Sequence, residues 1–243
     1  MDSYIVLFYF TFIIALQSTI GVGVLVLGTP FLLILNYDML QIFLILLPIS
    51  ILTSFINLIL IKFKNKKIKF IKKEKIIKFF SICIPSILIG MLILKYFQNV
   101  LNFKFLVSIV IILSTLLVSL KKRIRFKINF FRTSILSIIG IVHGLTNSGG
   151  TLMSLALTSN SERDFARYSI TYFYLILAFF QYLITIIIFH NYYFFSIDLK
   201  MFFLIFVGVC LGNIFNLFLN DNIYKLIVSL LALISSGLLL MNN

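Results

Sequence analysis

The sequence predicts an all-α polytopic membrane protein made of two inverted repeats, each a broken or re-entrant helical segment followed by three transmembrane helices. Three observations lead to this prediction. Hydrophobic residues make up 61% of the chain and the mean hydropathy is +1.14, whereas water-soluble domains are nearer half apolar. The apolar residues form runs long enough to cross a bilayer, which takes about 20 residues for a helix. Most of the 21 Lys and Arg residues fall in loops between these runs.

The first repeat is expected over residues 1–120. It opens with an apolar run over residues 4–35, which is too long for one ordinary span and too short for two. Gly21, Gly23 and Pro30 lie within that run, so we expect two half-helices joined by a break. Complete spans are expected near residues 39–61, 76–95 and 104–120, with a basic loop at residues 62–78.

The second repeat is expected over residues 133–243, after a basic linker at residues 121–132. It begins with a run that is apolar except at its centre and that continues to Ser159. A polar turn, which includes Arg163 and Arg167, separates this run from three spans, expected near residues 168–190, 199–219 and 222–240. The two halves therefore share one order, a long broken segment followed by three spans.

Both basic segments are expected on the cytoplasmic side, because short loops rich in Lys and Arg stay inside. The remaining basic residues decide how often each broken segment crosses the membrane. If each broken segment returns to the side from which it entered, Arg163, Arg167 and Lys225 also lie inside, and more of the basic residues are cytoplasmic than with single crossings. This arrangement places both termini outside and makes the two repeats antiparallel.

The centre of the second broken segment is the most informative stretch of the chain. Residues 140–157 read GIVHGLTNSGGTLMSLAL, which gathers glycine, hydroxyl and amide residues inside an apolar run. A helix that breaks at membrane depth needs such residues, because its bared backbone groups cannot find partners in lipid. Residues 17–23 form a weaker counterpart in the first half, and paired breaks of this kind indicate a transporter's substrate site. The candidate substrate-binding residues are Gln17, Ser18, Thr19, Gly21, Gly23, His143, Gly144, Thr146, Asn147, Ser148, Gly149, Gly150 and Thr151.

The two motifs together resemble those of the TauE/SafE sulfite exporter family. The first is QSTIGVG from Gln17, followed by Pro30, and the second is HGLTNSGG from His143. The likeness covers both halves and implies an integral membrane permease that exports sulfite, a sulfonate or a related organosulfur or organic anion. The triple-glycine run common in that family is reduced to two glycines in each half, with Asn147 and Thr151 at positions often held by glycine.

The expected spans offer neutral polar groups rather than charges. Every Asp and Glu lies at a terminus or in an expected loop, which argues against a cation substrate and against coupling through an intramembrane carboxylate. Lys and Arg are also absent from the expected span centres, so the spans are expected to contain no fixed cation. Two half-helix N-termini that meet at mid-membrane would supply unpaired N–H groups and about half a positive charge each. This chemistry suits a small oxyanion.

Each candidate also has a purely structural interpretation. The glycines could serve close helix packing, and the hydroxyls of Ser18, Thr19, Ser148 and Thr151 could bond back to carbonyls of their own helices. His143 is either an interhelical hydrogen-bonding residue or a proton acceptor and substrate contact, because an imidazole titrates near neutral pH. The amide residues expected to hydrogen-bond between helices are Asn57, Gln181, Asn213 and Asn216.

The residues favour a permease for a small anion and leave two alternatives. An anion channel would share the same repeats and would differ in lacking saturable flux and counterflow. An intramembrane hydrolase would need His143 to activate Ser148, but the sequence around Ser148 lacks the spacing of a nucleophile turn. We therefore expect a transporter and not an enzyme.

The remaining composition limits the partners. The formal net charge of +14 reflects topology rather than nucleic-acid binding, because the basic residues fall in loops beside the spans. The expected partners are a small anionic substrate and the lipid bilayer of the cell membrane. Cys83 and Cys210 lie in apolar surroundings without CxxC spacing, and we expect neither a cofactor nor a metal.

Overall fold

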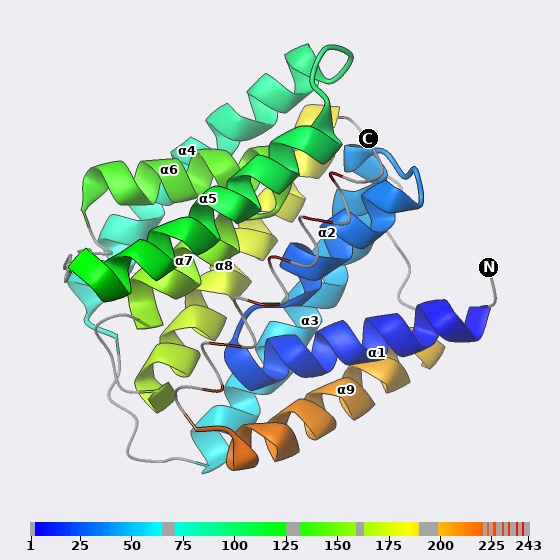
Figure 1. Ribbon diagram of the computed structural model, residues 1–243, viewed down its shortest axis with the longest axis vertical. Helices are drawn as coiled ribbons and strands as arrows, with labels where there is room; N and C mark the ends of the chain where they lie inside the picture. Colours follow the sequence, from blue (N-terminus) through cyan, green and yellow to red (C-terminus); the bar gives the residue numbers. More distant parts are fainter. Residues whose placement is uncertain are drawn as a thin grey trace.

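The computed structural model describes residues 3–64, 71–124, 132–158, 163–189 and 199–220, with single positions between 223 and 240. No strand occurs in this part of the chain, which confirms the predicted all-α polytopic fold. Figure 1 shows the helices packed as one bundle, with α8 in the middle of the view. The helices are α1 (Ser3–Ile20), α2 (Val24–Ile34), α3 (Met39–Lys64), α4 (Lys73–Phe97), α5 (Phe103–Ile124), α6 (Thr133–Thr146), α7 (Gly149–Thr158), α8 (Arg163–Phe189) and α9 (Leu199–Phe218).

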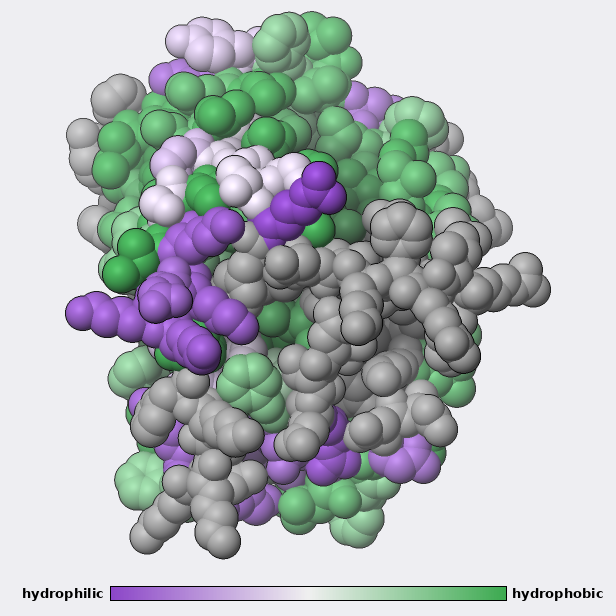
Figure 2. Space-filling model, turned by 90° about the vertical axis from the view of Figure 1, so that its left-hand side faces the viewer, coloured by the Kyte–Doolittle hydropathy of each residue, from purple (hydrophilic) through white to green (hydrophobic). Residues whose placement is uncertain are grey.

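Among the described helices, α3, α4, α8 and α9 are each long and apolar enough to cross a membrane. They coincide with four of the spans expected from the sequence. The outer side of α9 carries Phe203, Phe206, Phe215 and Phe218, each more than half exposed. Figure 2 shows hydrophobic surface bordering a group of hydrophilic side chains on one face. Large apolar side chains exposed on long apolar helices are what a lipid-facing surface requires, so the chain is a multi-pass membrane protein.

The two basic segments lie only partly within the described residues. α3 continues to Lys64 and α4 starts at Lys73, so both ends of the loop expected at residues 62–78 are helical. Residues 65–70 and 125–131 lie outside the described residues, as do both chain ends. The repeat boundaries and the side of the membrane on which these segments lie therefore stay predictions.

Both long segments are broken where the sequence predicts, between α1 and α2 and between α6 and α7. The residue after each first half-helix has a positive φ, 91° at Gly21 and 60° at Asn147. Its N–H donates to the carbonyl four residues earlier, from Gly21 to Gln17 at 2.7 Å and from Asn147 to His143 at 2.9 Å. Glycine enters this left-handed conformation freely and asparagine tolerates it, so two different residues make the same break.

Each second half-helix folds back along the first. Tyr9 in α1 donates a hydrogen bond to the carbonyl of Leu27 in α2 at 2.9 Å, and its ring stacks on Phe31 with centroids 3.8 Å apart. In the other half, a Cβ added at Gly149 would lie 2.4 Å from the carbonyl oxygen of Ile139 in α6. These contacts join residues on either side of each break, as expected for a segment that turns back toward its starting side.

The two halves pack against each other through matching pairs of helices. α1 lies along α9, and α6 lies along α4, so the first half-helix of each half contacts the second complete span of the other (Figure 1). Both contacts use glycines at Gly-x-x-x-Gly spacing, Gly208 with Gly212 in α9 and Gly140 with Gly144 in α6. A Cβ at Gly212 would lie 2.2 Å from the carbonyl oxygen of Ala15, so only glycine permits this approach. Related halves produce reciprocal packing of this kind, while their inverted orientation in the membrane stays a prediction.

Candidate functional site

Both breaks lie against one side of α8. A Cβ added at Gly21 would meet the side chain of Ile170 at 2.8 Å, and one added at Gly150 would meet the ring of Tyr174 at 2.2 Å. Buried polar residues follow the same helix at the spacing of one face. We call this set the α8 stripe, and it consists of Arg167, Thr171, Tyr174, Gln181 and Thr185. α8 is therefore the element on which the two breaks meet.

Gln17 is fixed in the first break by hydrogen bonds. Its Nε2 donates to the carbonyl of Ser50 at 3.1 Å and to Oγ of Ser54 at 3.0 Å, both in α3. Its Oε1 accepts the N–H of Val24 at 3.0 Å. Val24 opens α2, so Gln17 satisfies one of the N–H groups that a helix start leaves without an intrahelical partner. Gln17 thus positions α2, and the next amides of that first turn remain for other partners.

Four candidate hydroxyls bond to their own backbone, whereas Oγ of Ser18 is buried and has no hydrogen-bond partner among the described residues. The four donate to carbonyl oxygens two to four residues earlier: Thr19 to Ala15, Thr146 to Val142, Ser148 to Thr146 and Thr151 to Ser148. These are the back-bonds of the structural interpretation, and they occupy the protons that a substrate would need. Because Ser148 donates within its own turn, the structure gives it no hydrogen bond to His143 that would activate it as a nucleophile.

The candidate glycines have three different roles. Gly144 belongs to the contact between α6 and α4, because a Cβ there would lie 2.4 Å from a carbonyl oxygen of α4. Gly23 and Gly149 let the chain turn, since a Cβ at either position would meet the backbone of the preceding half-helix. Gly21 and Gly150 instead face α8. Close packing therefore accounts for Gly144, while the other four shape the breaks.

Buried polar atoms without partners gather at the second break. Within the described residues, neither ring nitrogen of His143, nor Oδ1 of Asn147, nor the hydroxyl of Tyr174 has a hydrogen-bond partner. The ring centroids of His143 and Tyr174 lie 6.1 Å apart. Asn147 also reaches the other half, because its Nδ2 donates to Oγ1 of Thr29 in α2 at 3.2 Å. Such atoms are rare in folded proteins and require another group to complete them.

Tyr174 joins the two breaks, although it is absent from the candidates drawn from the sequence. Its ring covers Gly150 at the start of α7, and its hydroxyl lies beside the backbone amides of Leu25 and Val26 in the first turn of α2. The amides can only donate, and the phenol proton also needs an acceptor. The group that would complete this arrangement is therefore a hydrogen-bond acceptor. The sequence holds one signal for Tyr174, its place seven residues before Gln181 on the same helix face.

The amide residues expected between helices are found there, which confirms that expectation. Asn57 donates to the carbonyl of Ser18 at 3.1 Å, and Gln181 donates to that of His143 at 3.1 Å. Two further amides, both in α9, complete the set: Asn213 to Asn57 at 3.1 Å and Asn216 to the carbonyl of Thr19 at 2.9 Å. Carbonyls at the C-terminal ends of α1 and α6 thus receive side-chain donors from other helices.

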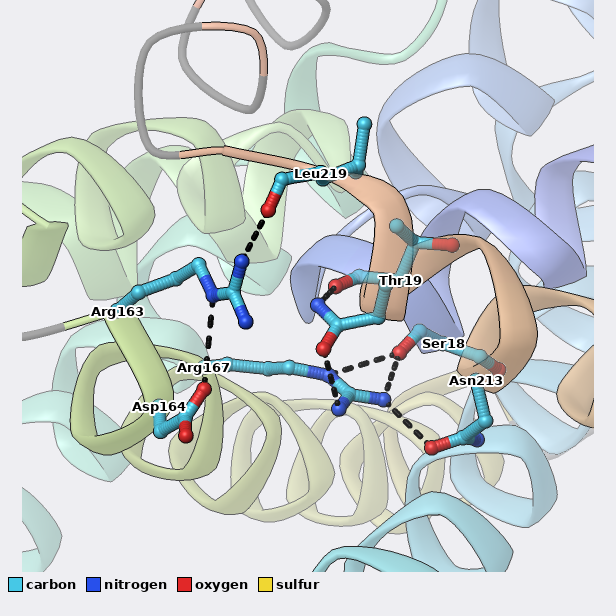
Figure 3. Close-up of polar contacts among 8 residues, drawn as sticks. Ser18, Thr19, Arg163, Asp164, Arg167, Asn213 and Leu219 are labelled. Carbon is cyan, nitrogen blue, oxygen red and sulfur yellow. Dashed lines mark hydrogen bonds and ion pairs between the residues drawn. The ribbon is translucent and has the colours of Figure 1, made fainter.

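Arg167 corrects the predicted polar turn, because it lies buried in the second turn of a helix long enough to cross the membrane, while the absence of cations from the span centres stays a prediction. α8 already begins at Arg163, so Arg167 lies within the helix and is only 7% exposed. Figure 3 shows its side chain reaching across to Ser18 and Asn213. Its guanidinium donates to the carbonyl of Ser18 at 3.0 Å through Nε and again through Nη2, and to three amide oxygens: Asn57 at 3.1 Å, Asn213 at 2.8 Å and Asn216 at 3.3 Å. Hydropathy places a charged residue in a loop, because the partners that allow its burial lie on distant helices.

Comparison with known proteins completes the description of the site. No curated protein and no solved structure matches the chain. The model of one family, sulfite exporter TauE/SafE, matches residues 6–242 of the 243. The match spans both breaks, the α8 stripe and the helices of both halves. The chain therefore belongs to the sulfite exporter TauE/SafE family.

Proposed function

We propose that this protein is a permease of the cell membrane that exports a small oxyanion, and that the anion binds between the first turns of α2 and α7 against Tyr174. The observation that carries the proposal is the buried Tyr174 hydroxyl, which faces the amides of Leu25 and Val26 and whose own proton has no acceptor among the described residues. The phenol proton and the two amides beside it are donors, and such donors fit an anion. The family, whose description is sulfite exporter, supports sulfite or a related organosulfur anion as the substrate.

The charges around the breaks support an anion as well. α2 and α7 both begin inside the protein, and a helix N-terminus carries about half a positive charge. Among the described residues, the buried polar set contains no Asp or Glu and includes Arg167. A cation would find no carboxylate there, whereas an oxyanion would meet backbone amides, a phenol and the imidazole of His143.

The re-entrant course of each broken segment is part of the proposal. The contacts of Tyr9 with Leu27 and Phe31 support it, because they place the two half-helices of the first break side by side. If both segments return to their starting sides, each half crosses three times and the halves are inverted. In a variant lacking Cys83 and Cys210, a cysteine at Ser3 should then react with an impermeant thiol reagent in intact cells. Protection of that cysteine would support single crossings instead.

A binding screen on the purified protein tests the substrate class. Sulfite, thiosulfate and small sulfonates should raise the melting temperature in a concentration-dependent way, because a ligand of the folded state stabilises it. Dimethyl sulfone, a neutral molecule of similar shape, and choline, a cation, serve as controls and should have no effect. Counterflow of a bound anion in liposomes should then identify a carrier rather than a channel. Stabilisation by choline, or by no anion at all, would contradict the proposal.

A further inference from the structure

The carbonyl groups at the C-terminal end of α1 are buried, and one charged side chain, that of Arg167, donates hydrogen bonds to them. α1 ends at Ile20 inside the protein, and a helix end leaves carbonyls without intrahelical partners and carries about half a negative charge. The carbonyl of Ser18 accepts hydrogen bonds from Arg167 and Asn57, and that of Thr19 accepts one from Asn216. The only charged group among these donors is the guanidinium of Arg167.

The negative end of α1 lies close to the positive start of α2. Only Gly21, Val22 and Gly23 separate the two helices, so their partial charges oppose each other at the first break. An anion held by the amides of Leu25 and Val26 would be repelled by the carbonyl end of α1. A full positive charge placed on those carbonyls reverses the sign of that end.

We propose that Arg167 is a positioning residue that sets the charge selectivity of the anion site, and this inference rests on the proposed function. The guanidinium neutralises the partial negative charge at the C-terminal end of α1. The partial positive charge at the start of α2 then attracts the anion without repulsion from α1. Arg167 does not touch the anion. It lies seven residues before Tyr174 on α8, which is about 10 Å along the helix axis at 1.5 Å per residue.

The second break is built differently, which makes the two halves unequal. The carbonyl of His143 near the end of α6 accepts the N–H of Asn147 at 2.9 Å and the Nε2 of Gln181 at 3.1 Å, both neutral donors. The carbonyl end of α6 is therefore satisfied by neutral hydrogen-bond donors, whereas the carbonyl end of α1 receives the charged guanidinium of Arg167. The charge that selects the anion is placed at the α1 end, beside α3 and α9.

The test compares anions of different charge. Sulfate and methanesulfonate share a sulfur oxyanion group and carry two and one negative charges near neutral pH. At about 10 Å and an effective dielectric constant of about 20, loss of the Arg167 charge should lower the affinity for methanesulfonate roughly tenfold and the affinity for sulfate roughly a hundredfold. Arg167→Gln should therefore lower the ratio of sulfate to methanesulfonate affinity by about tenfold, and Arg167→Lys should restore most of that ratio. Affinities come from the ligand dependence of the melting temperature.

Arg163 provides the matched control. It lies one turn before Arg167 on α8, donates to the carbonyl of Leu219, and pairs with Asp164 at 3.5 Å, with its side chain 27% exposed (Figure 3). Because solvent screens the partly exposed Arg163 side chain, Arg163→Gln should leave the affinity ratio unchanged. If Arg167→Gln does not fold, Asn213→Asp provides a second test, since it places a negative charge beside Nη2 of Arg167.

The outcomes separate the two proposals. If the wild-type protein binds no anion, the proposed function fails. If the wild type binds both anions but the Arg167 and Asn213 variants lower both affinities by the same factor, Arg167 only supports the fold and the inference is overturned. A selective loss for sulfate in Arg167→Gln and in Asn213→Asp, with Arg163→Gln unchanged, supports it.

Discussion

Replacing Tyr174 by Phe should raise the stability of the empty protein and lower its affinity for the anion. The hydroxyl is buried, and it has no hydrogen-bond partner in the described part of the chain. An unsatisfied buried polar group costs about 1–3 kcal/mol, and Phe keeps the ring that packs on Gly150. Without ligand, Tyr174→Phe should therefore unfold at a higher temperature than the wild type, by the equivalent of about 1 kcal/mol.

Binding should change in the opposite direction. A hydrogen bond from the Tyr174 hydroxyl to a charged group contributes about 1.5–3 kcal/mol. At 1.4 kcal/mol for each factor of ten, its loss should weaken anion binding by roughly tenfold to a hundredfold. Thermal unfolding over a range of sulfite or methanesulfonate concentrations measures both quantities on the same sample.

Tyr9→Phe is the matched control, because the same change removes a hydroxyl that does have a partner. Tyr9 donates to the carbonyl of Leu27 at 2.9 Å, so its loss should destabilise the empty protein by about 0.5–1.5 kcal/mol and leave anion affinity unchanged. A Tyr174→Phe protein that is less stable than the wild type and binds anions equally well would refute the assignment. Without ligand, the melting temperature should therefore rise in Tyr174→Phe and fall in Tyr9→Phe.

Three further predictions follow from the packing of the breaks and of the helix pairs. Gly150→Ala places a Cβ 2.2 Å from the Tyr174 ring and should abolish anion-dependent stabilisation, whereas Gly237→Ala, whose Cβ would have no described atom within 4 Å, should retain it. Gly212→Ala places a Cβ 2.2 Å from a backbone oxygen of α1 and should cost about 1–3 kcal/mol in the unliganded melt, with little change in affinity. His143→Gln keeps a hydrogen-bonding side chain at this buried position, so it should keep anion-dependent stabilisation, and a loss of that stabilisation would make the imidazole itself a contact of the substrate.

The sequence predicted the breaks because their cause is local. Gly21 and Asn147 follow apolar half-helices, and a glycine or asparagine at such a place can adopt the positive φ that ends a helix. The long apolar helices were equally predictable, since insertion depends on the hydropathy of consecutive residues. Within these segments the sequence located the two breaks, whereas only the structure shows that the hydroxyls of Ser148 and Thr151 donate within their own turns.

The chain by itself therefore determined the fold class, the breaks and the family. Only the tertiary structure decided which side chains face the breaks. Gln17 is occupied by α2 and α3, Tyr174 brings a hydroxyl to the start of α2, and Arg167 is buried against α1, α3 and α9. These roles depend on contacts between helices far apart in the sequence. Whether a charge is buried or a hydroxyl lacks a partner depends on the residues around it in space, and the hydropathy of the sequence does not show which residues those are.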